Sequence, residues 1–266
     1  MTDDWDFYFF SIKDWPASIA LDLGAARSAP DPARPWLLCV RLPLEQPRSD
    51  GLSSPEEAAA LHELEERIDD ALGAACGAEQ VGRLTWNGLR ELFYYGRQEE
   101  GFQSALDEVM AASPKREVYW RTEEDPEWTL YNDFLYPTPE QLQWIYDRRV
   151  VDQLRAHGDS LEARRPVDHY IYFPDAATRD GFLEAAAQRG FAGEPSDKQA
   201  EAPAEGGGEV ALRFCAHLAR MDSVDLSHIH DVVLDLRALA EAHSGEYDGW
   251  GCPVVRGGNP GDIIEA

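Results

Sequence analysis

Basic residues are scarce in this chain. Its 266 residues include only 24 Lys and Arg against 50 Asp and Glu, which gives a formal net charge of -26. Proteins that bind nucleic acid directly carry basic stripes beside aromatic residues, and the short pairs Arg148-Arg149 and Arg164-Arg165 do not supply one. The acidic excess extends over both halves, so it predicts a basic protein partner and no direct binding to nucleic acid. A high net charge is also an ordinary means of solubility.

Closely spaced cysteines are also missing. Cys39, Cys76, Cys215 and Cys252 have no near Cys or His partner of the kind that a zinc site or redox pair needs. No uncharged apolar run reaches the roughly 18 residues of a membrane span. The start, with Asp3 and Asp4, does not have the pattern of a signal peptide. We therefore expect a cytoplasmic protein with reduced thiols and without a metal, a cofactor or a membrane segment.

The composition and length indicate two folded domains. Hydrophobic residues make up 44% and aromatic residues 11%, which excludes a disordered chain. A chain of 266 residues suits one large domain or two of ordinary size. The proline-bearing segment Tyr136-Pro137-Thr138-Pro139 is the natural boundary, so we expect domains over residues 1–136 and 137–266.

The first half predicts strands interrupted by two helices. Ser54, Pro55 and Glu57 form a capping box for a helix that should end near Gly73. Asn87-Gly88 is typical of a two-residue hairpin turn. The expected strands lie at 5–12, 18–23, 36–42, 81–85, 89–95, 118–121 and 128–134, with a second helix over 100–111. The first pair should turn at Asp14-Trp15-Pro16 and the last at Glu124-Asp125-Pro126.

The second half predicts a leading helix followed by the order β-α-β-β-α-β. The expected helices cover 138–157, 175–190 and 225–240, and the expected strands lie at 167–173, near 191, at 210–221 and at 246–255. Residues 194–208 are rich in Pro, Ala, Glu and Gly, so we expect a mobile loop there. This order is the ferredoxin-like pattern. The fold class expected for the whole chain is α+β, with two ferredoxin-like or related antiparallel sheets and helices packed on one face of each.

The segment Gly245-Glu246-Tyr247-Asp248-Gly249-Trp250-Gly251 is the most informative stretch. Aromatic residues in a turn-rich segment can fix a corner of the core, and aromatic residues beside carboxylates also resemble a protein-binding hot spot. We therefore take Glu246, Tyr247, Asp248 and Trp250 as candidate protein-binding residues. Glu246 and Asp248 should share a side of an extended strand, which permits an acid/base pair, but no nucleophile, metal triad or phosphate loop accompanies them.

The histidines do not predict a metal site. His228 and His230 are two apart on a helix and point in different directions, so they should be solvent-facing. His169 and His217 lie on expected strands and are best explained as core or surface polar residues.

Several of these stretches, in the same order, resemble the bacterial family called regulator of ribonuclease E activity B. The likeness covers about residues 141–254: the leading helix with its acidic turn Gly158-Asp159, the strand 169–173, and the closing helix that runs into residues 246–251. It implies a ferredoxin-like fold and binding to the non-catalytic region of ribonuclease E, which alters RNA processing. The first half, through 84–88 and 90–95, is similar to an uncharacterised bacterial family, domain of unknown function 695, and that likeness implies no activity.

Taken together, the sequence favours a non-enzymatic, acidic protein-binding module that regulates a ribonuclease or another RNA-processing enzyme. Two alternatives stay open. One is an enzyme of unknown type with a site between the two domains. The other is an acidic mimic of nucleic acid, which would need carboxylates at phosphate-like intervals on one face.

Overall fold

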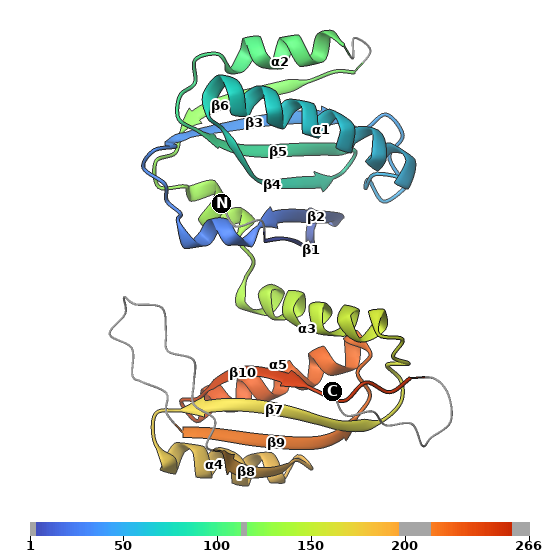
Figure 1. The fold of residues 1–266 in the computed structure, drawn as a ribbon, viewed down its shortest axis with the longest axis vertical. Coiled ribbons are helices and arrows are strands. Elements are labelled where there is room, and N and C mark those ends of the chain that lie inside the picture. Colours follow the sequence, from blue (N-terminus) through green and yellow to red (C-terminus); the bar gives the residue numbers. More distant parts are fainter. Residues whose placement is uncertain (1–3, 113–115, 197–213, 257–266) are drawn as a thin grey trace. The chain divides into compact units, whose positions relative to one another are not determined.

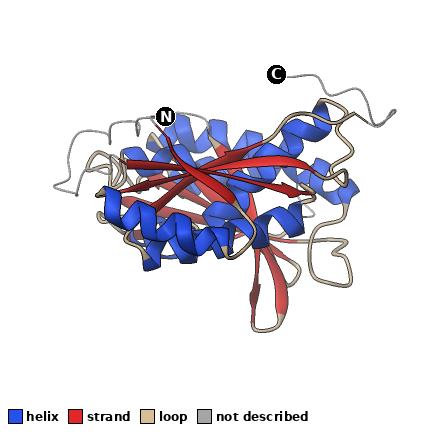
Figure 2. Cartoon of the chain, turned by 90° about the horizontal axis from the view of Figure 1, so that it is seen from below, coloured by secondary structure: helices blue, strands red, loops and turns tan. Residues whose placement is uncertain are grey.

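The computed structural model describes residues 4–112, 116–196 and 214–256. The chain divides into two compact units, Met1–Gln141 and Leu142–Ala266. Each unit contains its own antiparallel sheet, of six and four strands, with helices against it (Figures 1 and 2). The expected α+β class is confirmed. Among the described residues, no helix has the length and apolar character that crossing a membrane requires.

The N-terminal unit is a ferredoxin-like sheet extended by a hairpin. Its strands are β1 (Trp5–Ile12), β2 (Trp15–Asp22), β3 (Trp36–Pro43), β4 (Glu79–Trp86), β5 (Leu89–Gly96) and β6 (Tyr119–Glu124). Its helices are α1 (Pro55–Cys76) and α2 (Phe102–Ala111), with short helical turns η1 (Leu23–Arg27) and η2 (Leu130–Leu135). The strand order is β1-β2-β4-β5-β3-β6. From β3 to β6 the chain therefore follows the order β-α-β-β-α-β, and the β1–β2 hairpin widens the sheet beyond β4.

Local sequence signals set the bounds of α1. Ser54 Oγ accepts a hydrogen bond of 3.2 Å from the Glu57 amide, as predicted, but the Glu57 carboxylate accepts from the amides of Glu45 and Gln46 and does not close the capping box. The helix ends at Gly77, whose φ of 59° is in the left-handed region that favours glycine. Its buried side includes Leu61, Leu64, Ile68 and Leu72, whose spacing of three and four residues forms an apolar stripe that packs against β3 and β5.

The expected strand at 128–134 is wrong. These residues include the π-type helical turn η2, and β6 pairs with β3 instead. The Asp125 carboxylate causes the change, because it accepts hydrogen bonds from the amides of Thr129 at 2.8 Å and Leu130 at 3.0 Å. Trp128, with a φ of 52°, turns inward and stacks on Tyr95 at a centroid distance of 4.1 Å. A carboxylate that caps a turn thus replaces the predicted hairpin.

The first hairpin turns earlier than expected. Lys13 and Asp14 both have positive φ values, of 48° and 67°, and form the two-residue turn. Trp15 and Pro16 consequently belong to β2, where they pair with Ile12 and Ser11. The Asn87-Gly88 turn is as predicted, with φ values of 45° and 76°.

The C-terminal unit has the ferredoxin-like strand order. Its elements are α3 (Pro139–Ala156), β7 (Arg165–Phe173), α4 (Ala176–Ala187), β8 (Ala192–Ser196), β9 (Phe214–Asp222), α5 (Leu226–Ala242) and β10 (Glu246–Gly251). The strand order is β10-β7-β9-β8, all antiparallel. The mobile loop expected at 194–208 is wrong at its start, because Glu194–Ser196 pair with β9 as part of β8. Its remaining residues lie outside the described ranges.

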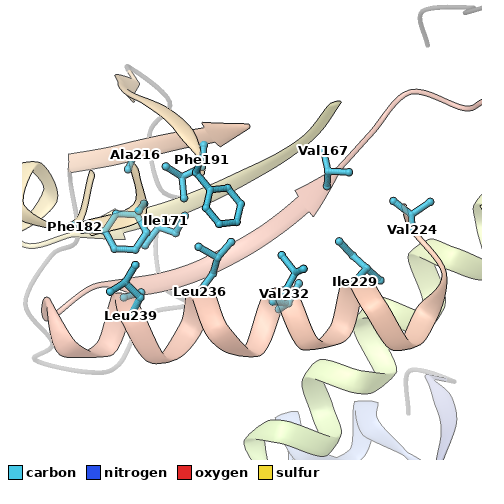
Figure 3. Packing of buried hydrophobic residues seen from close by; sticks show 14 of the residues in the cluster. Val167, Ile171, Phe182, Phe191, Ala216, Val224, Ile229, Val232, Leu236 and Leu239 are labelled. Carbon is cyan, nitrogen blue, oxygen red and sulfur yellow. The ribbon is translucent and has the colours of Figure 1, made fainter. Parts of the chain in front are cut away.

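The core of this unit lies between α5 and the sheet. Figure 3 shows Ile229, Val232, Leu236 and Leu239 on one face of α5, which is the face that packs toward Ile171 of β7. Their spacing of three and four residues is that of a helix with one apolar stripe. Val151 and Leu154 of α3 join the same cluster, so the leading helix belongs to this core.

Asp69, a partly buried residue of the N-terminal unit, has a carboxyl group whose charged form is less favourable in the folded protein than in water. Asp69 of α1 accepts a hydrogen bond of 2.5 Å from the hydroxyl of Tyr94 on β5. Burial raises the pKa of Asp69 to about 6, although this hydrogen bond opposes the shift. The folded state therefore binds a proton more tightly here than the unfolded state does.

The pKa of Asp69 gives the first testable prediction. Because its folded pKa is above the unfolded value of 3.8, the stability that it contributes is present at low pH and is lost as the pH rises through about 6. The unfolding free energy of the Asp69→Asn variant should gain up to about 2 kcal/mol relative to the wild type between pH 4 and pH 7. Urea unfolding at several pH values measures this difference, and a pH-independent difference would contradict it.

Candidate functional site

The candidate segment forms β10, an edge strand of the C-terminal sheet. Gly245 precedes it and lies against Phe173, where a Cβ atom would come within 2.2 Å of the ring. A residue with a side chain would clash with this ring, so the position requires glycine. The chain passes from α5 into β10 at that point, and β10 pairs with β7 alone among the described strands.

A β-bulge at Asp248 sets the direction of both aromatic side chains. Tyr247 pairs with Ile171 and Gly249 with Tyr170, so Asp248 is an extra residue in the ladder. In a regular strand, residues three apart point to opposite faces. The bulge shifts the alternation, and Tyr247 and Trp250 both point to the face that carries the helices. The expectation that Glu246 and Asp248 share a side assumed regular alternation, which the bulge removes.

Tyr247 is tied to a buried histidine. Its hydroxyl oxygen lies 2.8 Å from Nδ1 of His169 on β7. Burial raises the pKa of the Tyr247 hydroxyl well above its usual value, and burial lowers the pKa of His169 to about 4. Nε2 of His169 is buried without a hydrogen-bond partner among the described residues. Both groups are thus neutral at physiological pH, and they hold β10 against β7.

Trp250 donates to a carboxylate at the centre of a polar cluster. Asp147 of α3 is fully buried, and its Oδ1 accepts 2.9 Å hydrogen bonds from Trp250 Nε1 and Gln143 Nε2. Its Oδ2 accepts from His230 Nδ1 of α5 at 2.8 Å. Burial raises the pKa of Asp147, and the three hydrogen bonds oppose that shift. We call Gln143, Asp147, His230 and Trp250 the Asp147 cluster.

The same cluster joins two helices. Arg237, seven residues after His230 on α5, donates to Gln143 Oε1 at 3.1 Å. His230 meets Asp147 while Arg237 meets Gln143, so α3 and α5 run in opposite directions where they contact. Sequence reasoning missed this cluster. The signal was present, because Gln143, Asp147 and Val151 are four residues apart and place two polar residues on the buried stripe of α3.

The histidines depart in part from expectation. His230 is not solvent-facing: its side chain is 14% exposed and bonded to Asp147. His228 is more exposed, at 43%, and pairs with Asp222 at 3.0 Å. His169 is a core residue and His217 a partly exposed one that contacts Asp168 at 2.7 Å, in agreement with the sequence analysis. The described residues contain no group of three or more His, Cys, Asp or Glu side chains that could hold a metal ion.

Glu246 and Asp248 are the outward part of the segment. Both residues are exposed, whereas Tyr247 and Trp250 pack partly buried against the core. The four candidate residues therefore form two pairs, one that packs against the core and one that is exposed to solvent. The aromatic pair anchors the strand, and the two carboxylates give the sheet edge a negative surface.

The chain after β10 is fixed by a second buried carboxylate. Asp159 Oδ2 accepts from the Val255 amide at 2.6 Å and forms an ion pair with Arg165, whose side chain is 2% exposed. This ion pair and hydrogen bonds lower the pKa of Asp159 against the effect of burial. Asp159, in the acidic turn Gly158-Asp159, thus has a structural role: it holds the chain after β10 beside Arg165 of β7.

The comparison with family models covers both units. Residues 3–136 match the family of unknown function DUF695, which is half of the chain. The chain belongs to this family. Residues 144–252 match the model described as regulator of ribonuclease activity B, and this range includes the Asp147 cluster and β10. Both resemblances read from the sequence are confirmed.

Other comparisons add little. No curated protein matches the chain. A crystal structure of an unknown protein from Galdieria sulphuraria is 13% identical, with 81% of this chain and 96% of that chain covered and a TM-score of 0.20. A structure titled as a candidate transcriptional repressor of the glycine cleavage system is 10% identical, with 82% and 97% covered and a TM-score of 0.20.

The Asp147 cluster predicts a large effect of one substitution. Asp147→Ala leaves the donors of Trp250, His230 and Gln143 without their acceptor, so stability should fall by about 3 kcal/mol. The matched control is Asp152→Ala, on the same helix but with a side chain that is 47% exposed, and it should cost less than about 1 kcal/mol. Denaturant unfolding compares the two variants, and equal effects would contradict a structural role for Asp147.

Trp250 tests whether the segment is a corner of the core or a contact surface. Because Trp250 is only partly buried, Trp250→Ala should lower stability by about 2–3 kcal/mol, below the range for a fully buried large aromatic. Trp250→Phe keeps the ring packing and loses only the bond to Asp147, so it should cost about 1 kcal/mol. If Trp250→Ala instead leaves the denaturant midpoint unchanged and abolishes partner capture, Trp250 is a binding residue and not an anchor.

Proposed function

We propose that this protein is a non-catalytic regulator whose C-terminal unit binds a ribonuclease or another RNA-processing enzyme. The observation that carries the proposal is the match of residues 144–252 to the regulator of ribonuclease activity B model. The geometry of β10 supports it, since the groups able to do chemistry are occupied inside the fold. Tyr247 binds His169 and Trp250 binds Asp147, which leaves the two carboxylates at the edge as the external feature.

The partner surface that we propose is basic. Glu246 and Asp248 are exposed on an edge strand of a chain with a net charge of -26. A disordered Arg/Lys-rich region of an RNA-processing enzyme is the complementary partner. In this proposal the carboxylates steer the basic segment toward the edge of β10, and side chains near Tyr247 and Trp250 hold it there. Charge then sets mainly the association rate.

A kinetic binding experiment tests the proposal. The full chain is immobilised, and a ribonuclease of the same organism that carries an Arg/Lys-rich region is passed over it. Raising the salt concentration should slow association markedly and change dissociation less, because exposed charges are screened within about 10 Å at 0.1 M ionic strength. Binding without salt dependence, or no binding to the ribonuclease, would refute the proposed partner.

Charge-neutral variants locate the surface. Glu246→Gln with Asp248→Asn should lower the association rate at low salt by several-fold. The matched control is Asp180→Asn with Glu184→Gln, which removes the same charge from exposed residues of α4. Helix α4 packs on β8, at the opposite edge of the sheet from β10. Equal losses in the two variants would indicate a general charge effect and not a surface at β10.

An activity screen separates the regulator from the enzyme alternative. The purified full chain should change the rate at which the ribonuclease cleaves a model RNA while it cleaves none by itself. Turnover of a small-molecule substrate by the chain alone would refute the non-catalytic reading.

A further inference from the structure

The N-terminal sheet has an open edge at β6. This strand is last in the sheet order and pairs only with β3 among the described strands (Figure 1). The Asp125 amide donates to the Pro35 carbonyl at 2.8 Å, which identifies residues 35 and 125 as a hydrogen-bonded pair. Because such pairs alternate along an antiparallel ladder, every second residue of β6 directs its backbone groups away from β3. The outward-directed residues are Trp120, Thr122 and Glu124.

Large apolar side chains are exposed along this edge. Tyr119 is 55% exposed, Trp120 41% and Phe134, in η2, 39%. Trp120 lies edge-on against Phe102 at a centroid distance of 5.5 Å, so its position is fixed by packing. Exposed aromatic rings held in place are features of protein-binding surfaces.

Two acidic hollows flank the same strand. The first, of about 480 Å³, lies on the helix-covered face and includes Trp120 and Thr122 of β6. The second, of about 410 Å³, lies on the other face and includes Leu37 and Phe134. The acids that line the first are Glu99, Glu100 and Asp107. Those that line the second are Glu123, Glu124, Asp125 and Asp133, of which Glu123 forms an ion pair with Arg121 of β6 and Asp125 accepts from Tyr95 and the η2 amides. Among the described residues that line the first hollow there is no Lys or Arg. We call β6 with these hollows the β6 edge surface.

Charged residues on an edge strand often serve only to prevent pairing between copies of a protein. Two features of the β6 edge surface go beyond that purpose. Acids on the strand itself would be enough to block pairing, yet here they also come from the start of α2 and from η2. A protective edge would also lack exposed aromatic side chains, and this edge keeps Tyr119 and Trp120.

We propose that β6 binds an extended Lys/Arg-rich segment of another protein, which adds to the sheet as a further strand. Backbone groups of Trp120, Thr122 and Glu124 would supply the hydrogen bonds of the added ladder. Every second side chain of the segment would point to the helix-covered face, so its cations enter the first hollow, among Glu99, Glu100 and Asp107. Their aliphatic stems would lie along Trp120, with a cation–π contribution from its ring. This proposal does not depend on the ribonuclease partner of the C-terminal unit.

The probe is a fluorescein-labelled peptide of four Lys-Val repeats, with fluorescence anisotropy of the full chain as the measurement. Two further peptides carry N-methyl groups on every second residue, in the two possible phases. An added strand uses only alternate amides of the peptide, so one phase should retain affinity and the other should lose at least tenfold. A Glu-Val peptide of equal length should not bind. Equal affinities of the two methylated peptides would overturn the proposal.

Variants place the peptide on β6. Thr122→Pro removes an outward amide and no bond to β3, so affinity should fall at least tenfold. It also removes the hydrogen bond from the Thr122 hydroxyl to Glu99, and Thr122→Val, which loses that bond alone, should keep the affinity. The control is Ser11→Pro on β1, the other edge of the same sheet. The Leu23 amide donates to the Asp4 carbonyl at 2.9 Å, so by the same alternation Ser11 also faces outward. An equal loss in both variants would overturn the assignment to β6. If Thr122→Pro does not fold, the methylated peptides decide the question on the wild-type chain.

A charge test completes the design. Glu99→Gln with Asp107→Asn should weaken peptide binding several-fold, while Glu63→Gln with Glu66→Gln, exposed on α1, should leave it nearly unchanged. Sedimentation analysis of the first variant distinguishes the protective role. Self-association of that variant, together with no peptide binding by the wild type, would show that the acids only keep copies apart.

Discussion

The C-terminal unit depends on a single buried carboxylate. Asp147 is fully buried and receives hydrogen bonds from α3, α5 and β10, three elements that are far apart in the sequence. A buried acceptor of this kind is stable only when all its donors are in place, because an unmatched charge or donor in the interior costs several kcal/mol. Apolar packing between α5 and the sheet would tolerate small shifts. The Asp147 cluster tolerates few, so it fixes which way Trp250 points and holds the end of β10 against α3.

The acidic character of the surface follows from the composition, because 50 Asp and Glu are present against 24 Lys and Arg. Ion pairs such as Arg90 with Glu65 and Arg165 with Asp159 do not change this excess, since each removes an acid together with a base. The exposed carboxylates of β10 and of the β6 edge surface are part of that excess, at the margins of the two sheets. In each unit an edge strand combines fixed aromatic residues with negative charge.

Much of the fold could be predicted because its signals are local. The helix cap at Ser54, the apolar stripes of α1 and α5, and the Asn87-Gly88 turn each depend on residues a few positions apart. The errors came where a distant residue decides the local structure. The turn η2 forms because Asp125 caps it while Tyr95 holds both Asp125 and Trp128. No pattern within residues 128–134 contains that information.

The candidate site was predictable to a similar degree. Its segment and its four residues stand out in the sequence, but their orientation depends on the bulge at Asp248, and their anchoring depends on residues about 80 to 100 positions away. Asp147 could have been noticed as a polar residue on a buried stripe. Its partners His230 and Trp250 could not, since only the packing of α3 against α5 and β10 brings them together.

The bulge also changes the spacing of the two aromatic residues along β10. Two aromatic residues on one face of a regular strand are separated by one residue, whereas Tyr247 and Trp250 are separated by two, and the additional residue is the acidic one. Asp248 is thus the residue that the backbone register skips, between the pairs Tyr247–Ile171 and Gly249–Tyr170. A chain that lacked this residue would keep both anchors facing inward and would have a flat edge in place of a kinked one. One extra residue, Asp248, therefore supplies both an acidic side chain and the kink of the edge strand.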